Sequence, residues 1–138
     1  MNNRFKFRVW DKITNQYLQE LGIYYWHIPY SLDGEEITGE ANLVGLSELL
    51  KHDNFVTQQY TGLTDSNDDP IYEGDILKIS YGTMGDVIGQ VLYEADEGGY
   101  IFQWERKGPN QHHINLNCDV AFESVIVGNI FEHSELLK

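Results

Sequence analysis

One stretch decides the fold: Gln59-Tyr60-Thr61-Gly62-Leu63-Thr64-Asp65-Ser66-Asn67-Asp68-Asp69-Pro70-Ile71-Tyr72-Glu73-Gly74-Asp75-Ile76-Leu77-Lys78. Its middle part, residues 65–70, predicts a turn, because Asp and Asn side chains hydrogen-bond nearby backbone groups and Pro fixes φ. Gly74-Asp75 predicts a second sharp turn, since Gly adopts positive φ and an Asp side chain can accept from a neighbouring N–H. The apolar run of residues 76–79 then predicts a strand.

The chain after this stretch predicts short strands joined by turns. Residues 74–81 form the first strand, and residues 87–94 pair with residues 100–106 across an acidic, glycine-containing hairpin. Residues 107–119 are expected to be a polar loop, and residues 120–131 to close the domain. Gly89 and Gly128 lie in mid-strand, where a strongly bent sheet needs a bulge or a corner. The C-terminal half is therefore predicted to be a small SH3-like barrel or a β-sandwich.

The N-terminal half also predicts strands, with one short helix. Residues 4–10 alternate strictly between apolar and polar, and residues 21–30 are almost continuously apolar. Residues 46–52 have leucines at helical spacing, with Ser47 at the start of the helix and Asp53-Asn54 at its end. The chain is thus mainly β, with an N-terminal segment at 1–60 and a barrel-like domain at 61–138 in one compact unit. The predicted core consists of Phe5, Phe7, Ile76, Val91, Phe102, Trp104, Ile126 and Ile130.

The net charge, the apolar content and the cysteine count of the chain argue against several classes of function. The 138 residues carry a formal net charge of -13, which argues against broad contact with nucleic acid phosphates or anionic membranes. No apolar run long enough to span a membrane and no signal-peptide pattern is present, so a membrane role is not expected. The single cysteine, Cys118, excludes an intrachain disulfide. We expect a protein of a reducing cytoplasm.

The positive charge is concentrated at one end. Arg4, Lys6, Arg8 and Lys12 are four of the nine basic residues. A strand with Arg4, Lys6, Arg8 and Trp10 on one face is a candidate interaction strand. It docks on the acidic remainder of its own chain or of a sister subunit, or it offers a basic edge to an anionic ligand. We expect a homo-oligomer in which residues 4–10 pack near a neighbouring subunit.

Three blocks of sequence carry a family resemblance. They are Phe7-Arg8-Val9-Trp10-Asp11-Lys12, the opening stretch, and Val125-Ile126-Val127-Gly128-Asn129-Ile130-Phe131-Glu132 followed by Leu136-Leu137. In this order they resemble the YopX family of phage and prophage proteins; Asp68-Asp69-Pro70 departs from the glycine turn common in relatives. The resemblance implies a largely β protein, encoded by a temperate phage and acting inside a bacterium. It implies no activity, and the motif residues are expected to be structural: Tyr60, Gly62, Asp65, Tyr72, Glu73, Gly74, Asp75, Gly128 and Asn129.

Metal sites are not expected. Residues 65, 67 and 69 alternate as in a calcium loop, but Pro70 stands where that loop needs glycine and Ile76 where it needs a bidentate Glu. His112, His113 and Cys118 supply three nominal zinc ligands, yet adjacent histidines point in different directions and a fourth ligand is missing.

Catalytic residues and cofactors are not predicted either. Cys118 lacks the sequence signature of a nucleophile. Glu73 and Asp75 could do acid–base work in a cleft, although such pairs are frequent in an acidic chain. The aromatic face formed by Tyr100, Phe102 and Trp104 could stack nucleobases, but the absence of surrounding basic residues favours core packing.

Two functional hypotheses follow. The first is a non-enzymatic phage accessory protein that binds a host or phage protein through its strands or barrel surface. The second is a role connected with nucleic acid, either DNA binding through the strand of Arg4, Lys6 and Arg8 or imitation of DNA by the acidic surface.

Overall fold

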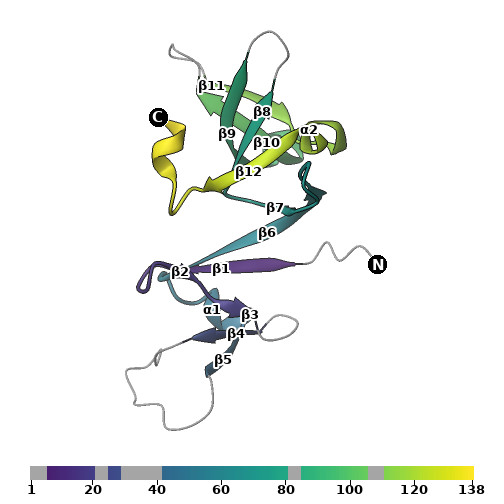
Figure 1. Ribbon diagram of the computed structural model, residues 1–138. Helices are drawn as coiled ribbons and strands as arrows, with labels where there is room; N and C mark the ends of the chain where they lie inside the picture. Colours follow the sequence, from purple (N-terminus) through teal and green to yellow (C-terminus); the bar gives the residue numbers. More distant parts are fainter. Residues whose placement is uncertain (1–5, 21–24, 29–41, 81–84, 106–110) are drawn as a thin grey trace. The chain divides into compact units, whose positions relative to one another are not determined.

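The protein folds as two compact units rich in β-strands. The structure is a computed structural model, and it describes residues 6–20, 25–28, 42–80, 85–105 and 111–138 (Figure 1). Residues Lys6–Gln59 form the N-terminal unit, and Tyr60–Lys138 belong to the C-terminal unit. The prediction of a mainly β protein is confirmed. Predicted features at Arg4, Phe5 and residues 21–24, 29–41, 81–84 and 106–110 lie outside the described residues.

The C-terminal unit is built on one curled antiparallel sheet of five strands. They are β8 (Asp75–Ser80), β9 (Asp86–Glu94), β10 (Gly99–Glu105), β11 (Gln111–Asn115) and β12 (Ser124–Asn129), in the order β11-β10-β9-β8-β12. Successive strands form a meander, and β12 returns beside β8, so the sheet curls into a half-barrel (Figure 1). This curled sheet fits the predicted small barrel. The predicted hairpin is confirmed, with Tyr100 opposite Tyr93.

The residues of the opening stretch form the entry to this sheet. Strand β6 (Phe55–Thr64) pairs its last residues with the short β7 (Pro70–Tyr72), and a turn then leads into β8. A 3-10 turn, η2 (Ala95–Glu97), closes the β9–β10 hairpin because the Glu94 side chain accepts from Asp96 N and Gly98 adopts φ 70. Another, η3 (Ser134–Leu137), ends the chain.

The core of this unit lies between the curled sheet and its connections. The buried cluster consists of Ile71, Leu77, Ile79, Val91, Phe102, Leu116 and Ala121. Ile76, Val91 and Phe102 are buried as predicted. The prediction of full burial is wrong for Trp104, Ile126 and Ile130, which are only partly buried. The strand positions of Trp104 and Ile126 explain this: the Trp104 ring stacks between Phe102 and His112, and Ile126 lies on the outermost strand.

The two mid-strand glycines have different roles. Gly128 lies at a bulge in the β12–β8 pairing, as predicted. Gly89 pairs regularly with Leu77, so it does not mark a bulge there. A Cβ atom on Gly89 would lie 2.3 Å from the backbone oxygen of Gln103 and 2.8 Å from the Phe102 ring. Gly89 is therefore needed for close packing over Phe102.

The predicted polar loop at residues 107–119 is wrong in its described part. Residues 111–115 form strand β11, and a short helix α2 (Cys118–Phe122) begins after Asn117, whose side chain accepts from Val120 N at 3.0 Å. An edge strand needs backbone pairing on one side only, so a polar sequence can adopt it when β10 is already in place. Ile114, opposite Phe102, is its one aliphatic side chain.

The N-terminal unit combines two small antiparallel arrangements. Strand β1 (Phe7–Asp11) pairs with β2 (Gln16–Tyr17) on one side and with the first half of β6 on the other. Strands β3 (Gln19–Glu20), β4 (Tyr25–Ile28) and β5 (Asn42–Gly45) form a three-stranded sheet. The buried cluster is Val9, Trp26, Ile28, Leu49 and Phe55, with Phe7 only partly buried against it.

The helix of this unit is shorter than predicted. Helix α1 (Leu46–Leu49) contains four residues, followed by a turn that leads to β6. Gly45, rather than Ser47, is its N-cap, and no side chain makes a capping hydrogen bond. Without that cap, the helix depends on the burial of Leu49. No helix among the described residues is long and apolar enough to cross a membrane.

Candidate functional site

Asp65 ties the acidic turn to a distant strand. Its side chain is 3% exposed. The Oδ1 atom accepts from Asn67 N at 2.9 Å and Asp69 N at 3.0 Å, and Oδ2 accepts from Ile126 N at 3.0 Å. Backbone N–H of Ser66 also donates to the oxygen of Ser124, at 2.9 Å. The turn thereby occupies backbone groups on the outer edge of β12.

The second turn brings three strands together. Gly74 has φ 84, a value that L side chains rarely adopt. The Asp75 carboxylate accepts from Tyr72 N at 2.8 Å. Gly74 donates to the oxygen of Val91 at 2.8 Å and accepts from Ile130 N at 2.9 Å. The predicted carboxylate pair, Glu73 and Asp75, is thus divided, because Asp75 is buried in the turn.

The remaining motif residues also determine the local conformation of the backbone. Gly62 has φ 86 where the pairing of β6 with β7 changes register, and the rings of Tyr60 and Tyr72 lie 5.7 Å apart. Asn129 accepts from Phe131 N and Glu132 N, both at 3.0 Å.

Gly128 is required beside Asn129. A Cβ on Gly128 would lie 2.6 Å from the ring of His133. The motif of the sequence is therefore a set of turns and caps, and its polar groups bind the chain itself.

Tyr93 and Tyr100 form an aromatic pair at the end of the β9–β10 hairpin that sequence reasoning missed. Tyr93 is 55% exposed and its ring meets that of Tyr100 edge-on, with centroids 5.4 Å apart. Burial raises the pKa of the Glu73 carboxyl. Burial, the charge of Glu73 and the neighbouring Tyr93 together raise the pKa of Tyr100. The available signal was the position of both tyrosines at the predicted hairpin end.

The candidate interaction strand is occupied within its own unit. Nε of Arg8 donates to Gln58 Oε1 at 2.8 Å, and its guanidinium lies 4.6 Å from the centroid of the Tyr17 ring. Trp10 is only 4% exposed and packs edge-on against Tyr17. Trp10 of the candidate interaction strand is therefore buried within its own unit, where β2 pairs beside that end of β1. Lys6 is exposed.

Comparison with known proteins decides the family. The family model described as "YopX protein" matches residues 6–138. The chain belongs to the YopX family. A crystal structure of protein EF1440 from Enterococcus faecalis is similar to this YopX-family chain, with 22% identity, a TM-score of 0.56, and coverage of 96% of this chain and 97% of that one. At this identity the likeness shows the fold alone. Comparison with curated proteins gives no match.

The other candidate sites of this YopX-family protein are dispersed. Nε2 of His113 lies 3.2 Å from Glu97 Oε1, whereas the ring of His112 stacks on Trp104 at 5.8 Å. Cys118 is exposed on α2. Within the described ranges, no group of three or more His, Cys, Asp or Glu residues could hold a metal ion.

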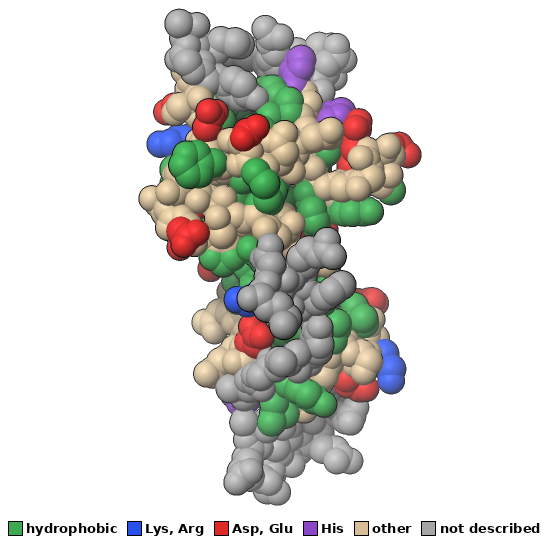
Figure 2. All heavy atoms as spheres, turned by 90° about the vertical axis from the view of Figure 1, so that its right-hand side faces the viewer, with side chains coloured by type: hydrophobic (Ala, Val, Ile, Leu, Met, Phe, Trp, Pro, Cys, Tyr) green, Lys and Arg blue, Asp and Glu red, His purple; other side chains and the backbone are tan. Residues whose placement is uncertain are grey.

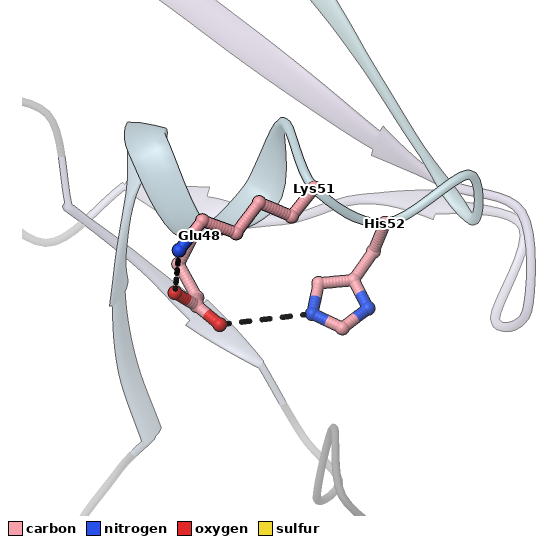
Figure 3. Close-up of polar contacts among 3 residues, drawn as sticks. All are labelled: Glu48, Lys51 and His52. Atoms are coloured by element: carbon pink, nitrogen blue, oxygen red, sulfur yellow. Dashed lines mark hydrogen bonds and ion pairs between the residues drawn. The ribbon is translucent and has the colours of Figure 1, made fainter.

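Three polar side chains interact at the end of α1 in the N-terminal unit. Glu48 reaches both Lys51, at 3.4 Å, and Nε2 of His52, at 3.8 Å (Figure 3). The Lys51 and Glu48 side chains are largely exposed, and exposed pairs of this spacing contribute about 0.3–0.5 kcal/mol. The trio is therefore a modest support of the helix end rather than a reaction centre.

Proposed function

We propose that this YopX-family protein is a non-enzymatic module that binds another protein. One observation carries the proposal: polar motif side chains such as Asp65, Asp75 and Asn129 are used in holding backbone. Chemistry on a substrate needs polar groups that point toward it, whereas these point into the fold. The motif thus supplies a scaffold, and function falls to the side chains that the scaffold exposes.

Exposed apolar side chains on regular strands support protein binding. Tyr25 and Leu43 are 52% and 56% exposed on the paired strands β4 and β5, whereas the intervening Trp26 is buried. Tyr93 is similarly exposed on β9. Hydrophobic side chains also reach the surface of the C-terminal unit in Figure 2, with acidic side chains among them. Aromatic residues on rigid elements are common anchors of protein interfaces.

We place this function in the cytoplasm of a bacterium, as an accessory role of a temperate phage or prophage. The family membership, the single cysteine and the strongly acidic composition support that setting. The alternative of direct DNA binding through the basic strand has less support, because Arg8 is paired with Gln58 and stacked on Tyr17. Imitation of DNA by the acidic surface remains the nucleic-acid alternative.

Two experiments test the proposal. Affinity capture of the tagged protein from phage-infected host cells should retain a specific protein, and a Tyr25→Ser/Leu43→Ser/Tyr93→Ser variant should lose it. The matched control carries serine at Asn67 and Asp69, two exposed positions in the turn around Asp65. This control should still retain the captured protein. Gel shifts with single- and double-stranded DNA at low salt should show no complex. Retention of no protein, or a salt-sensitive DNA complex, would refute protein binding as the function.

A further inference from the structure

Strand β11 forms an open edge of the five-stranded sheet. It is the last strand in the order β11-β10-β9-β8-β12, and among the described strands it pairs with β10 alone. Its register with β10 is unbroken from Gln111 to Asn115, so no bulge turns this edge away. The strand also contains neither lysine nor proline. These are devices by which native proteins protect a sheet edge from pairing with another chain.

The opposite edge of the same sheet is closed. On β12, the N–H of Ile126 donates to Asp65 Oδ2 at 3.0 Å, and the oxygen of Ser124 accepts from Ser66 N at 2.9 Å. The acidic turn therefore occupies the backbone groups that a further strand would need there. A sheet with one open and one closed edge can join a second copy in a closed pair, but it cannot extend into a fibre.

The direction of the backbone groups on β11 follows from its pairing. Leu116 N donates to the oxygen of Tyr100 at 3.0 Å, one position beyond Asn115, the last paired residue of β11. In an antiparallel pair, residues bonded to the neighbouring strand alternate with residues whose N–H and C=O point away from it. The even-numbered positions of β11 therefore bond to β10, and the odd-numbered positions, which include His113 and Asn115, direct their backbone groups outward.

We propose that β11 pairs with β11 of a second copy of this chain, antiparallel and about a two-fold axis at His113. The outward groups impose this register: positions 111, 113 and 115 of one copy lie opposite positions 115, 113 and 111 of the other. Each outward N–H then meets an outward carbonyl oxygen, and the two sheets join with corresponding faces on the same side. A strand added to a sheet edge in this way gains its affinity from backbone hydrogen bonds.

Side chains along the strand also fit a second copy. In the joined sheet, Ile114 lies opposite His112 of the other copy, at a pair of positions where side chains approach closely. Ile114 is only partly buried against the core of its own unit. The His112 ring stacks on Trp104, with centroids 5.8 Å apart. The pairing therefore covers apolar surface that β10 leaves open.

Charge favours contact between two acidic copies at this edge. The chain has a net charge of -13, whereas residues 111–115 contain no carboxylate. The Glu97 carboxylate beside the strand is itself engaged by Nε2 of His113, at 3.2 Å. Two copies therefore meet along a strand that adds no negative charge of its own. Repulsion between the remaining acidic surfaces and the small area of a single strand contact make the dimer weak and reversible.

Cysteine cross-linking locates the two-fold axis. A Cys118→Ser background removes the exposed native thiol. In this background His113→Cys should form a covalent dimer under mild oxidation, because the Cα atoms of a hydrogen-bonded pair lie about 5.5 Å apart, within the range of a disulfide. Asn115→Cys is the matched control, since Asn115 is equally exposed but its counterpart lies four positions along the strand, roughly 13 Å away. Equal cross-linking of the two variants, or none at position 113, would overturn the register.

A second pair of variants tests the backbone contact. His113→Pro removes an outward N–H and no bond to β10, and an edge strand tolerates proline at such a position. It should raise the dissociation constant of the dimer at least about tenfold in analytical sedimentation. His113→Thr keeps the N–H and should dimerise like the wild type. Amide spectra establish that each variant is folded, and unchanged dimerisation of folded His113→Pro would overturn the proposal.

The β11 contact is separable from the one expected at residues 4–10 and from the binding of another protein. Charge reversal at Arg4 and Lys6 should leave the His113→Cys cross-link unchanged. Higher salt should strengthen it, because salt screens the repulsion between acidic copies. Loss of the cross-link on charge reversal, or a monomer mass for the wild type at all concentrations, would overturn the dimer. A captured protein that competes with the cross-link would assign the edge to that partner and overturn the second copy as its occupant.

Discussion

The Oδ2 atom of Asp65 accepts a hydrogen bond from the backbone N–H of Ile126, 3.0 Å away and 61 positions further along the chain. The same carboxylate holds two N–H groups of its own turn. One buried side chain therefore fixes a local turn and attaches it to the last strand. If Asp65 were replaced, the N–H groups of the turn and of the last strand would lose their charged acceptor together. Asp65 therefore connects the sequence motif to the fold of the C-terminal unit.

Replacement of Asp65 by alanine should lower the free energy of unfolding by about 3 kcal/mol, because buried N–H groups lose a charged acceptor. Chemical denaturation measures this loss. Asp69→Ala, an exposed side chain in the same turn, should change stability by less than about 0.5 kcal/mol. Similar losses in the two variants would show that the carboxylate of Asp65 does not hold the strand.

A side chain at Gly74 should destabilise the protein, because its φ of 84 is unfavourable for any β-branched residue. Gly74→Val should reduce stability by about 1–3 kcal/mol, measured by thermal unfolding. Gly99→Ala is the matched control, since a Cβ there meets nothing within 4 Å. An unchanged melting temperature for Gly74→Val would contradict the positive φ.

Two aromatic neighbours should differ in their contribution to the core. Phe102 is completely buried, whereas Trp104 is partly buried. Phe102→Ala should cost about 3–5 kcal/mol, the usual range for an emptied aromatic site, and Trp104→Ala should cost less. Denaturant titration of both variants gives the comparison. A larger loss of stability for Trp104→Ala than for Phe102→Ala would show that the inner face of β10 is assigned wrongly.

Stability should depend on pH through Glu73. Burial raises the pKa of its carboxyl in the folded state, so the native state binds the proton more tightly than the unfolded chain. The resulting stabilisation is complete below the ordinary pKa of 4.5 and is lost as pH rises through the raised value. The stability of Glu73→Gln relative to wild type should therefore rise between acidic and neutral pH, because only the wild type loses stability over that range. Parallel pH dependence of unfolding in both proteins would disprove this linkage.

Segregation of basic residues at the N-terminus predicts self-association, with residues 4–10 near a neighbouring subunit. Light scattering at tens of micromolar protein should give the mass of an oligomer. Charge reversal at Arg4 and Lys6 should weaken it most at low salt, where screening is least; Arg8 is better left intact, because its contacts with Gln58 and Tyr17 support the unit itself. A monomer mass for the wild type would rule out the oligomer.

Local patterns in the sequence determined a large part of this protein. Alternation predicted that Phe7 and Val9 face the core, and the acidic turn between β9 and β10 predicted their hairpin. Turn residues such as Asp65 and Gly74 act over a few positions, through their own side chain or their own φ. Such effects are readable from the sequence because the interacting groups are close along the chain.

Only the tertiary structure decided which distant backbone groups meet. The polar residues of β11 form a strand because they pair with the edge of β10. Their own sequence has no periodicity that predicts a strand. Trp10 is buried within the N-terminal unit, where Tyr17 of the neighbouring strand β2 packs edge-on against its ring. The turn at Gly74 lies beside β9 because the N–H of Gly74 donates to the oxygen of Val91. Long-range backbone pairing depends on geometry rather than on side-chain type, so the sequence determined the strands and turns while the assembled sheet determined the candidate site.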